Sequence, residues 1–242
     1  MRKQFLLIVL LAVCFTASSQ YTYTIFYNNK QYKVDQKSIV KDSAGKVHDY
    51  NSWANMLTTG EYDIRPVDAD SDKSGFLLVK LSSEEQMRRI KQAPKPRGTR
   101  VFTDGKKIAS FSAFDMNGAK VDLKELKGKI VVLNFWFIRC PPCRLERPYL
   151  NQLVQEYKTD SSVVFIAVAL DPKFQLENFL KDNPFDYQVI PDGREIADNY
   201  MVDQYPTHVI LNDEGRVAFH TISYNAVTGY WLRKTIDELK TN

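Results

Sequence analysis

Cys140 and Cys143 are the residues of this 242-residue chain whose type and spacing best support a chemical reaction. They follow an apolar run at 130–137 and precede a helical pattern, and two thiols at this spacing can close a small disulfide ring. Free backbone N–H groups in the first turn of a helix stabilise a thiolate, which is the species that attacks another disulfide. The motif therefore predicts a redox-active dithiol.

The neighbours of the two cysteines bear on how such a dithiol would work. Pro141 and Pro142 stiffen the loop, and neither can donate a backbone N–H to sulfur, so we expect a comparatively reducing pair. Arg139 adds a positive charge that would favour the Cys140 thiolate, the alternative being a solvated surface arginine. We expect Cys140 to be exposed at the helix start and Cys143, about one turn further, to lie against the fold.

Beyond residue 108 the apolar pattern alternates between strand-like and helix-like stretches. Runs without polar alternation, such as 163–168, suit central strands that are covered on both faces. Helices that alternate with the first strands indicate an α/β layered fold, and the turn residues at 212–215 predict a closing antiparallel hairpin. The predicted strands are 130–137, 162–169, 185–190, 207–212 and 216–220, and the predicted helices are 142–158, 173–182, 193–200 and 229–240.

The first part of the chain has a different pattern and no motif that indicates chemistry. Short alternating stretches between residues 21 and 87 predict a small β-rich or α+β module. Ser82 or Ser83 would cap a helix that runs to about Lys91, and prolines then mark a linker. The predicted organisation is a signal peptide at 1–20, an N-terminal module at 21–99 and a C-terminal α/β domain at 100–242.

Residues 1–20 have the basic start, apolar stretch and small residues of a secretory signal peptide. The apolar stretch is shorter than the roughly 20 residues of a membrane-spanning helix. Cleavage would remove Cys14; in the rival interpretation Cys14 is lipidated, although Val13 is larger than such signals prefer. The mature chain would keep only Cys140 and Cys143, in a periplasmic or other cell-envelope compartment where disulfides persist.

The charge of the chain is nearly balanced. The net charge is +4, and the small basic cluster at 91–100 is interrupted by two prolines and a glycine. We interpret the cluster as a linker and expect no nucleic-acid partner.

Residues 108–242 resemble the thioredoxin-like domain of the TlpA/ResA-type thiol–disulfide oxidoreductases of the bacterial cell envelope, a domain of the AhpC/TSA-Redoxin type. The resemblance implies a central mixed sheet with flanking helices. It also implies that Cys140 attacks the substrate disulfide and Cys143 resolves the mixed disulfide, with no cofactor beyond the redox-active disulfide itself. Its landmarks are Phe114–Gly118, Leu123–Gly128, Leu133–Trp136, Cys140–Cys143, Pro148 and Tyr205–Thr207.

The resemblance assigns a carboxylate to the site. Thioredoxins place a buried Asp six residues before the first cysteine, where this chain has Asn134, which cannot titrate. Glu146, three residues after Cys143 and thus on the same helix face, matches the carboxylate of the family and would relay the Cys143 proton. The alternative is a surface glutamate that pairs with Arg147 or Lys158.

The resemblance also suggests where a substrate binds. Pro206 matches the cis-proline that lies opposite the dithiol and leaves the preceding backbone free to pair with a substrate strand. Tyr205 is bulkier than the usual residue there, so substrate preference stays open, and Trp136 would form core and site floor. The predicted substrate-binding residues are Tyr205, Pro206, Arg139, Trp136, Pro141 and Pro142.

Two other functions could use the same cysteines. Peroxiredoxins carry a P-x-x-x-T/S-x-x-C pattern, but Leu133 and Phe137 occupy those positions before Cys140. A CxxC pair also binds Zn²⁺ or Cu⁺, but zinc needs two more ligands, and the histidines have no ligand spacing. We predict no metal site and interpret three residues as ordinary surface or core histidines: His48, His208 and His220.

The sequence therefore predicts an exported thiol–disulfide oxidoreductase that reduces protein disulfides. In an oxidising compartment it would need a membrane-embedded thiol donor of electrons. The N-terminal module could dock a partner or form a homodimer, or its aromatic residues could only build a core.

Overall fold

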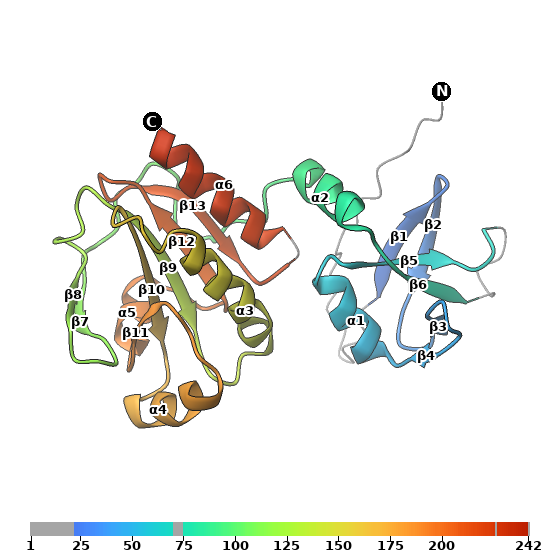
Figure 1. Cartoon of the computed structure of the whole chain (residues 1–242), viewed down its shortest axis with the longest axis horizontal. Helices are drawn as coiled ribbons and strands as arrows, with labels where there is room; N and C mark the ends of the chain where they lie inside the picture. Colours follow the sequence, from blue (N-terminus) through green and yellow to red (C-terminus); the bar gives the residue numbers. More distant parts are fainter. Residues whose placement is uncertain (1–21, 70–74, 226, 242) are drawn as a thin grey trace. The chain divides into compact units, whose positions relative to one another are not determined.

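The computed structural model describes residues 22–69, 75–225 and 227–241, which divide into two compact units at the Ala93–Pro94 bond (Figure 1). The predicted signal peptide, with Cys14, lies outside the described residues. Among the helices that these ranges contain, none is both long and apolar enough to cross a bilayer.

The first unit combines a hairpin, a four-stranded sheet and helices. The hairpin turn holds Asn28 and Asn29 at φ 48° and 64°, the positive values that a two-residue type I′ turn requires. The sheet has the order β4-β3-β6-β5, and Trp53 of α1, a helix that the sequence pattern did not predict, is fully buried in the core. The elements are β1 Tyr23–Tyr27, β2 Lys30–Val34, β3 Val40–Lys41, β4 Val47–His48, α1 Tyr50–Thr58, β5 Tyr62–Pro66, β6 Phe76–Lys80 and α2 Ser83–Gln92.

Helix α2 begins as the sequence predicts. The Ser82 side chain accepts the N–H of Glu85, and the Glu85 carboxylate accepts the N–H of Ser82, which is a capping box. Arg89 of this helix donates to the buried Asp63 of β5 at 2.8 Å. This ion pair ties α2 to the sheet.

The second unit is built on a five-stranded mixed sheet of order β11-β10-β9-β12-β13 (Figure 1). Strands β9 and β10 run parallel, as do β10 and β11, whereas β12 is antiparallel to both β9 and β13. The predicted α/β layers and the closing hairpin are confirmed. The elements are β7 Ser112–Phe114, β8 Lys120–Asp122, β9 Ile130–Trp136, α3 Pro141–Glu156, β10 Val163–Ala169, α4 Lys173–Asp182, β11 Gln188–Ile190, α5 Arg194–Asn199, β12 Thr207–Leu211, β13 Val217–Ile222 and α6 Thr228–Thr241.

Every residue of the central strand β9 is buried, because both faces of the sheet are covered. Ile130, Val132 and Trp136 face an apolar cluster with residues of α3, α4 and α6. Val131 and the residues two and four positions after it face a second cluster, which contains residues of α5 and of the β7–β8 region. Asn134 falls in the first, helix-covered register, where an apolar side chain would be expected.

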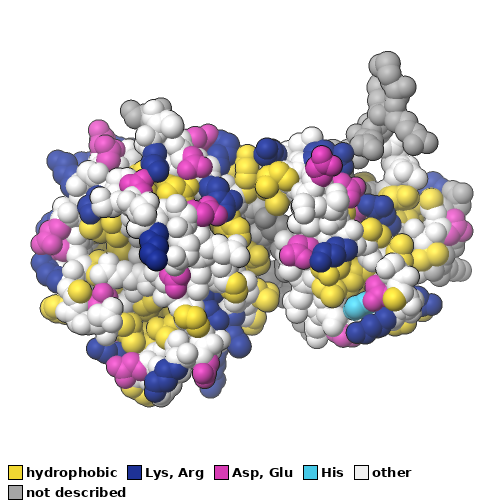
Figure 2. Space-filling model, viewed as in Figure 1, with side chains coloured by type: hydrophobic (Ala, Val, Ile, Leu, Met, Phe, Trp, Pro, Cys, Tyr) yellow, Lys and Arg dark blue, Asp and Glu magenta, His cyan; other side chains and the backbone are white. Residues whose placement is uncertain are grey.

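The visible surface carries charges of both signs. In Figure 2, lysine and arginine side chains alternate with aspartate and glutamate side chains on the face of each unit. That face presents no extended patch of one sign.

Candidate active site

The two cysteines form a disulfide at the start of α3. Cys140 is the N-cap residue of the helix, and its Sγ accepts the backbone N–H of Cys143 at 3.3 Å. The S–S bond is 2.03 Å long. Pro141 and Pro142 occupy the first helical positions, where a missing N–H costs little because it has no partner within the helix.

The expectation that Cys140 is exposed is wrong for this disulfide form. Cys140 is 2% exposed and Cys143 4%, and both belong to the apolar cluster that contains Trp136. The reason is the capping role: the Cys140 side chain folds back over the first turn to meet the N–H of Cys143, instead of extending into solvent. Exposure therefore does not distinguish the two sulfurs.

A carboxylate that the sequence analysis missed holds the loop before the motif. Asp171, which follows β10, accepts the backbone N–H of Ile138 on its Oδ2 at 2.6 Å. The neighbouring N–H of Leu170 donates to the Trp136 carbonyl at 3.1 Å. Because β9 and β10 are adjacent and parallel, their carboxyl ends meet, and Asp171 braces the segment that leads into Cys140.

The Tyr205–Pro206 peptide bond is cis, as the resemblance implies. Thr207, the next residue, pairs with Phe135 near the end of β9, so the proline lies at the same edge of the sheet as the dithiol. The Tyr205 ring packs edge-on against Phe137 at 5.4 Å, and its hydroxyl donates to the Val202 carbonyl at 2.9 Å. Burial raises the pKa of the Tyr205 hydroxyl, which keeps that group neutral.

The other predicted substrate-binding residues fall into two groups. Arg139 and Pro141 are exposed and Pro142 is half-buried around the cysteines, where a bound chain could reach them. Trp136 is 2% exposed and packs against Phe185 at 5.4 Å. It can support the site from below but presents almost no surface to a substrate.

Glu146 lies in the core, so the alternative of a surface glutamate is wrong. It is 1% exposed; its Oε1 accepts from Asn134 Nδ2 at 3.2 Å, and its Oε2 lies 2.9 Å from His208 Nε2. The i, i+3 spacing on α3 places it on the face that carries Cys143. A buried carboxylate thus lies close to the second cysteine, in a pocket of polar side chains within the apolar cluster.

His208 is a core histidine, one of the two environments that the sequence predicts for it, but spacing along the chain does not show its partner. It is fully buried, and its Nε2 lies 2.9 Å from Oε2 of Glu146, 62 residues earlier. A usable signal is present: His208 stands two residues after the cis-proline, as the second residue of β12, and apolar residues follow it to the end of the strand.

The other histidines do not join this site. His220 accepts the Thr99 N–H at 2.8 Å, and His48 pairs with Asp42 in the first unit. Within the described ranges, no group of three or more His, Cys, Asp or Glu side chains could hold a metal ion.

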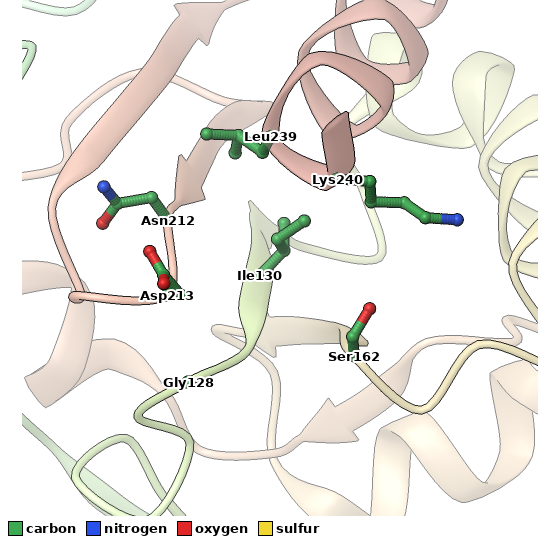
Figure 3. Close-up of a pocket in the computed structure, with 7 residues that line it drawn as sticks. All are labelled: Gly128, Ile130, Ser162, Asn212, Asp213, Leu239 and Lys240. Atoms are coloured by element: carbon green, nitrogen blue, oxygen red, sulfur yellow. The ribbon is translucent and has the colours of Figure 1, made fainter. Parts of the chain in front are cut away.

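A separate pocket opens at the opposite end of β9 (Figure 3). Gly128, Ile130, Ser162 and the 212–213 turn line it, with Leu239 and Lys240 of α6. Ile130 begins the strand that ends near Cys140, so the length of the sheet separates this pocket from the dithiol. The Lys240 ammonium is paired with Asp160 at 2.6 Å.

Comparison with known proteins supports a thiol-based chemistry. Residues 105–220 match the AhpC/TSA family. ResA of a Bacillus cereus strain, a thiol-disulfide oxidoreductase, is 36% identical over 114 residues, covering 47% of this chain and 66% of that protein. ResA of Bacillus subtilis (strain 168) is 32% identical over 121 residues, covering 50% and 68%. The chain thus spans about two thirds of the length of these curated relatives.

Solved structures show the same fold. A Chlorobium tepidum protein assigned as thiol:disulfide interchange protein DsbE aligns with a TM-score of 0.53 and 26% identity, covering 57% of this chain and 98% of that one. A Neisseria meningitidis protein assigned as a thioredoxin aligns with a TM-score of 0.50 and 27% identity, covering 57% and 93%. The predicted thioredoxin-like fold is confirmed.

Proposed function

The chain belongs to the family of ResA-type thiol–disulfide oxidoreductases, and we propose that it exchanges electrons between its Cys140–Cys143 dithiol and disulfides of other proteins. The observation that carries the proposal is the position of the disulfide. It caps α3 beside the cis-proline end of β12, with a buried carboxylate one turn further along the helix.

The exchange has two steps in the reducing direction. The Cys140 thiolate attacks one sulfur of a substrate disulfide, and the other substrate sulfur leaves as a thiolate that takes a proton from solvent. Cys143 then loses its proton, and its thiolate attacks Cys140 to release the second substrate thiolate and close the internal disulfide. Two electrons pass to the substrate, and an external thiol donor must return two.

Glu146 is the proposed acceptor of the Cys143 proton. Cys143 is buried, so water cannot readily take that proton, whereas Glu146 lies on the same face of α3. A carboxylate that receives the proton inside the fold avoids leaving an isolated charge in the apolar cluster.

The two prolines support a reducing role. They leave the Cys143 N–H as the nearest backbone donor to the Cys140 sulfur, so the thiolate gains less stabilisation than a polar dipeptide would provide. A less stabilised thiolate makes the dithiol a better electron donor.

We propose a cell-envelope location and a membrane-embedded thiol donor on the basis of the signal-like residues 1–20. A reductase in an oxidising compartment cannot draw on the cytosolic thiol pool. Dimerisation through the first unit is a separate proposal, tested by comparing the molecular mass in solution of the mature chain with that of residues 100–242 alone.

The test is reduction of insulin by the purified protein with dithiothreitol as donor. We expect the native protein to accelerate the reaction, Cys140→Ser to abolish it, and Cys143→Ser to accumulate a mixed disulfide that mass spectrometry detects. Activity in Cys140→Ser equal to the native rate would overturn the proposal. A peroxide-reduction assay on the same samples checks the peroxiredoxin alternative, which predicts peroxide turnover that depends on Cys140.

A further inference from the structure

Three polar side chains from three elements meet inside the apolar cluster beneath the dithiol. Asn134 comes from β9, Glu146 from α3 and His208 from β12, and each is at most 1% exposed. Asn134 and His208 are direct cross-strand partners in the β9–β12 register. A buried charge is costly unless it is hydrogen-bonded, so the partners of Glu146 decide whether it can be ionised there.

The hydrogen-bond geometry assigns donors and acceptors within this triad. Asn134 Nδ2 carries two hydrogens and lies 3.2 Å from Glu146 Oε1 and 3.4 Å from His208 Nδ1. If Nδ1 accepts, the imidazole proton lies on Nε2, which is 2.9 Å from Glu146 Oε2. His208 is then a neutral Nε2–H donor, and the Glu146 carboxylate accepts a hydrogen bond on each oxygen.

The groups on the sheet side of the triad are uncharged. Thr221 of β13 is the cross-strand partner of His208, and its hydroxyl donates to the Arg97 carbonyl at 2.9 Å. Asn134, the partner on the other side, cannot titrate. No charge from these strands competes with the Glu146–His208 contact.

The groups on the helix side are also accounted for. Tyr187, before β11, is buried, and burial, the Glu146 charge and Tyr149 raise its pKa, so it stays neutral. Arg147, next to Glu146 on α3, donates to Asn183 at 3.0 Å and packs over Phe179. His208 and Asn134 are therefore the groups that the described contacts give Glu146.

We propose that His208 is a positioning residue for Glu146. The hydrogen bond from its Nε2–H keeps the Glu146 carboxylate ionised and fixes its orientation on the face of α3 that carries Cys143. The carboxylate can then accept the Cys143 proton when the mixed disulfide is resolved. This inference rests on the proposed function, because it assigns His208 a part in the second step of that exchange.

The first experiment measures the pH dependence of insulin reduction by His208→Leu, His208→Gln and the native protein. Leucine removes the donor, so protonated Glu146 is favoured and the acid limb of the profile moves up by about one pH unit, as expected for one hydrogen bond to a charged group. Glutamine supplies an amide donor in place of the imidazole, so most of that shift should disappear and the acid limb should lie near its native position. His48→Gln, a histidine change in the other unit, is the matched control and keeps the native profile.

A double substitution tests whether His208 acts through Glu146. In the Glu146→Gln background, His208→Leu should leave the acid limb unchanged, because the group it positions is already gone. A full additional shift in that background, or an unshifted acid limb in folded His208→Leu alone, would overturn the proposal.

A measurement on the native protein covers the case in which a variant does not fold. Long-range ¹H–¹⁵N correlation spectra at neutral pH should show His208 as the neutral Nε2–H tautomer, and a doubly protonated or Nδ1–H ring would refute the assignment. If Cys140→Ser loses exchange while His208→Leu keeps the native pH profile of insulin reduction, this inference is wrong and the proposed function stands. If the native protein exchanges no disulfides, the proposed function itself fails.

Discussion

A buried carboxylate in each unit, Asp63 in the first and Glu146 in the second, is stabilised by partners of a different kind. Asp63 in the first unit has a 7% exposed side chain and pairs with Arg89 at 2.8 Å and Arg65 at 3.5 Å, whose side chains are 32% and 35% exposed. Glu146 in the second unit meets His208 and an amide, with no arginine among its described partners. The comparison separates a structural ion pair from the site at which the proposed mechanism moves a proton.

The physical difference lies in the partners. A guanidinium keeps its charge at every ordinary pH and pairs with the Asp63 carboxylate, while its outer edge stays in water. An imidazole donates a hydrogen bond without adding a permanent charge, so the proposed proton transfer to Glu146 does not have to break an ion pair. Asp63 should therefore matter to folding, and Glu146 to the rate of exchange.

The largest expected effect is on catalysis. Glu146→Gln keeps the shape and removes the proton acceptor, so insulin reduction should slow about 100-fold, the lower range for loss of a general base. Asp63→Asn in the same assay should keep the native rate. Equal losses in both variants would erase the distinction between the two carboxylates.

The next effect is on stability, and here Asp63 rather than Glu146 is the carboxylate expected to matter. Asp63→Ala leaves Arg89 and Arg65 without their anion, and we expect the free energy of unfolding of the first unit to fall by about 1–3 kcal/mol, reduced from the value for a fully buried pair because the arginines reach solvent. Urea denaturation followed by tryptophan fluorescence, to which Trp53 in the core of that unit contributes, measures it. A change smaller than about 0.5 kcal/mol would show that the pair contributes little.

A third carboxylate sharpens the contrast, because Asp171 binds only backbone at the site. Asp171→Ala removes the acceptor of the Ile138 N–H and should loosen the loop before Cys140. We expect a loss of about 1–2 kcal/mol in the second unit and a several-fold slower exchange without a shift in its pH profile. A shifted profile would instead place Asp171 in the proton path.

The smallest effect concerns His220, whose Nδ1 accepts a backbone N–H and whose Nε2 lies 3.5 Å from the exposed Asp104 carboxylate. Burial, opposed by Asp104 and assisted by Lys95, lowers the pKa of His220, whose Nδ1 accepts the Thr99 N–H. Between the two pKa values His220 binds a proton in the unfolded chain but not in the folded chain. The free energy of unfolding therefore falls as pH drops below about 6.5, and it stops changing below the pKa of the folded state. Thermal unfolding of His220→Gln should lose that part of the pH dependence, and an unchanged slope would contradict it.

Local pattern was enough for most of the second unit. The predicted strand at 130–137 and helix at 173–182 match β9 and α4 closely, since apolar periodicity and turn residues act over a few neighbours. The cap of α2 at Ser82 was also readable, because a capping box joins residues three apart. The sequence analysis does not include helix α1, a nine-residue helix set among short strands, although Asp49 caps it through the Ser52 N–H.

The sequence by itself determined the dithiol, its place between a buried strand and a helix, and Glu146 one turn after Cys143. Only the tertiary structure decided what surrounds them: the burial of Cys140, the brace from Asp171, and the meeting of Glu146 with His208. Those contacts depend on strand order and register, which pair residues 74 positions apart such as Asn134 and His208. The residues next to His208 in the sequence do not indicate its partner, because the packing of α3 across the sheet brings Glu146 to it.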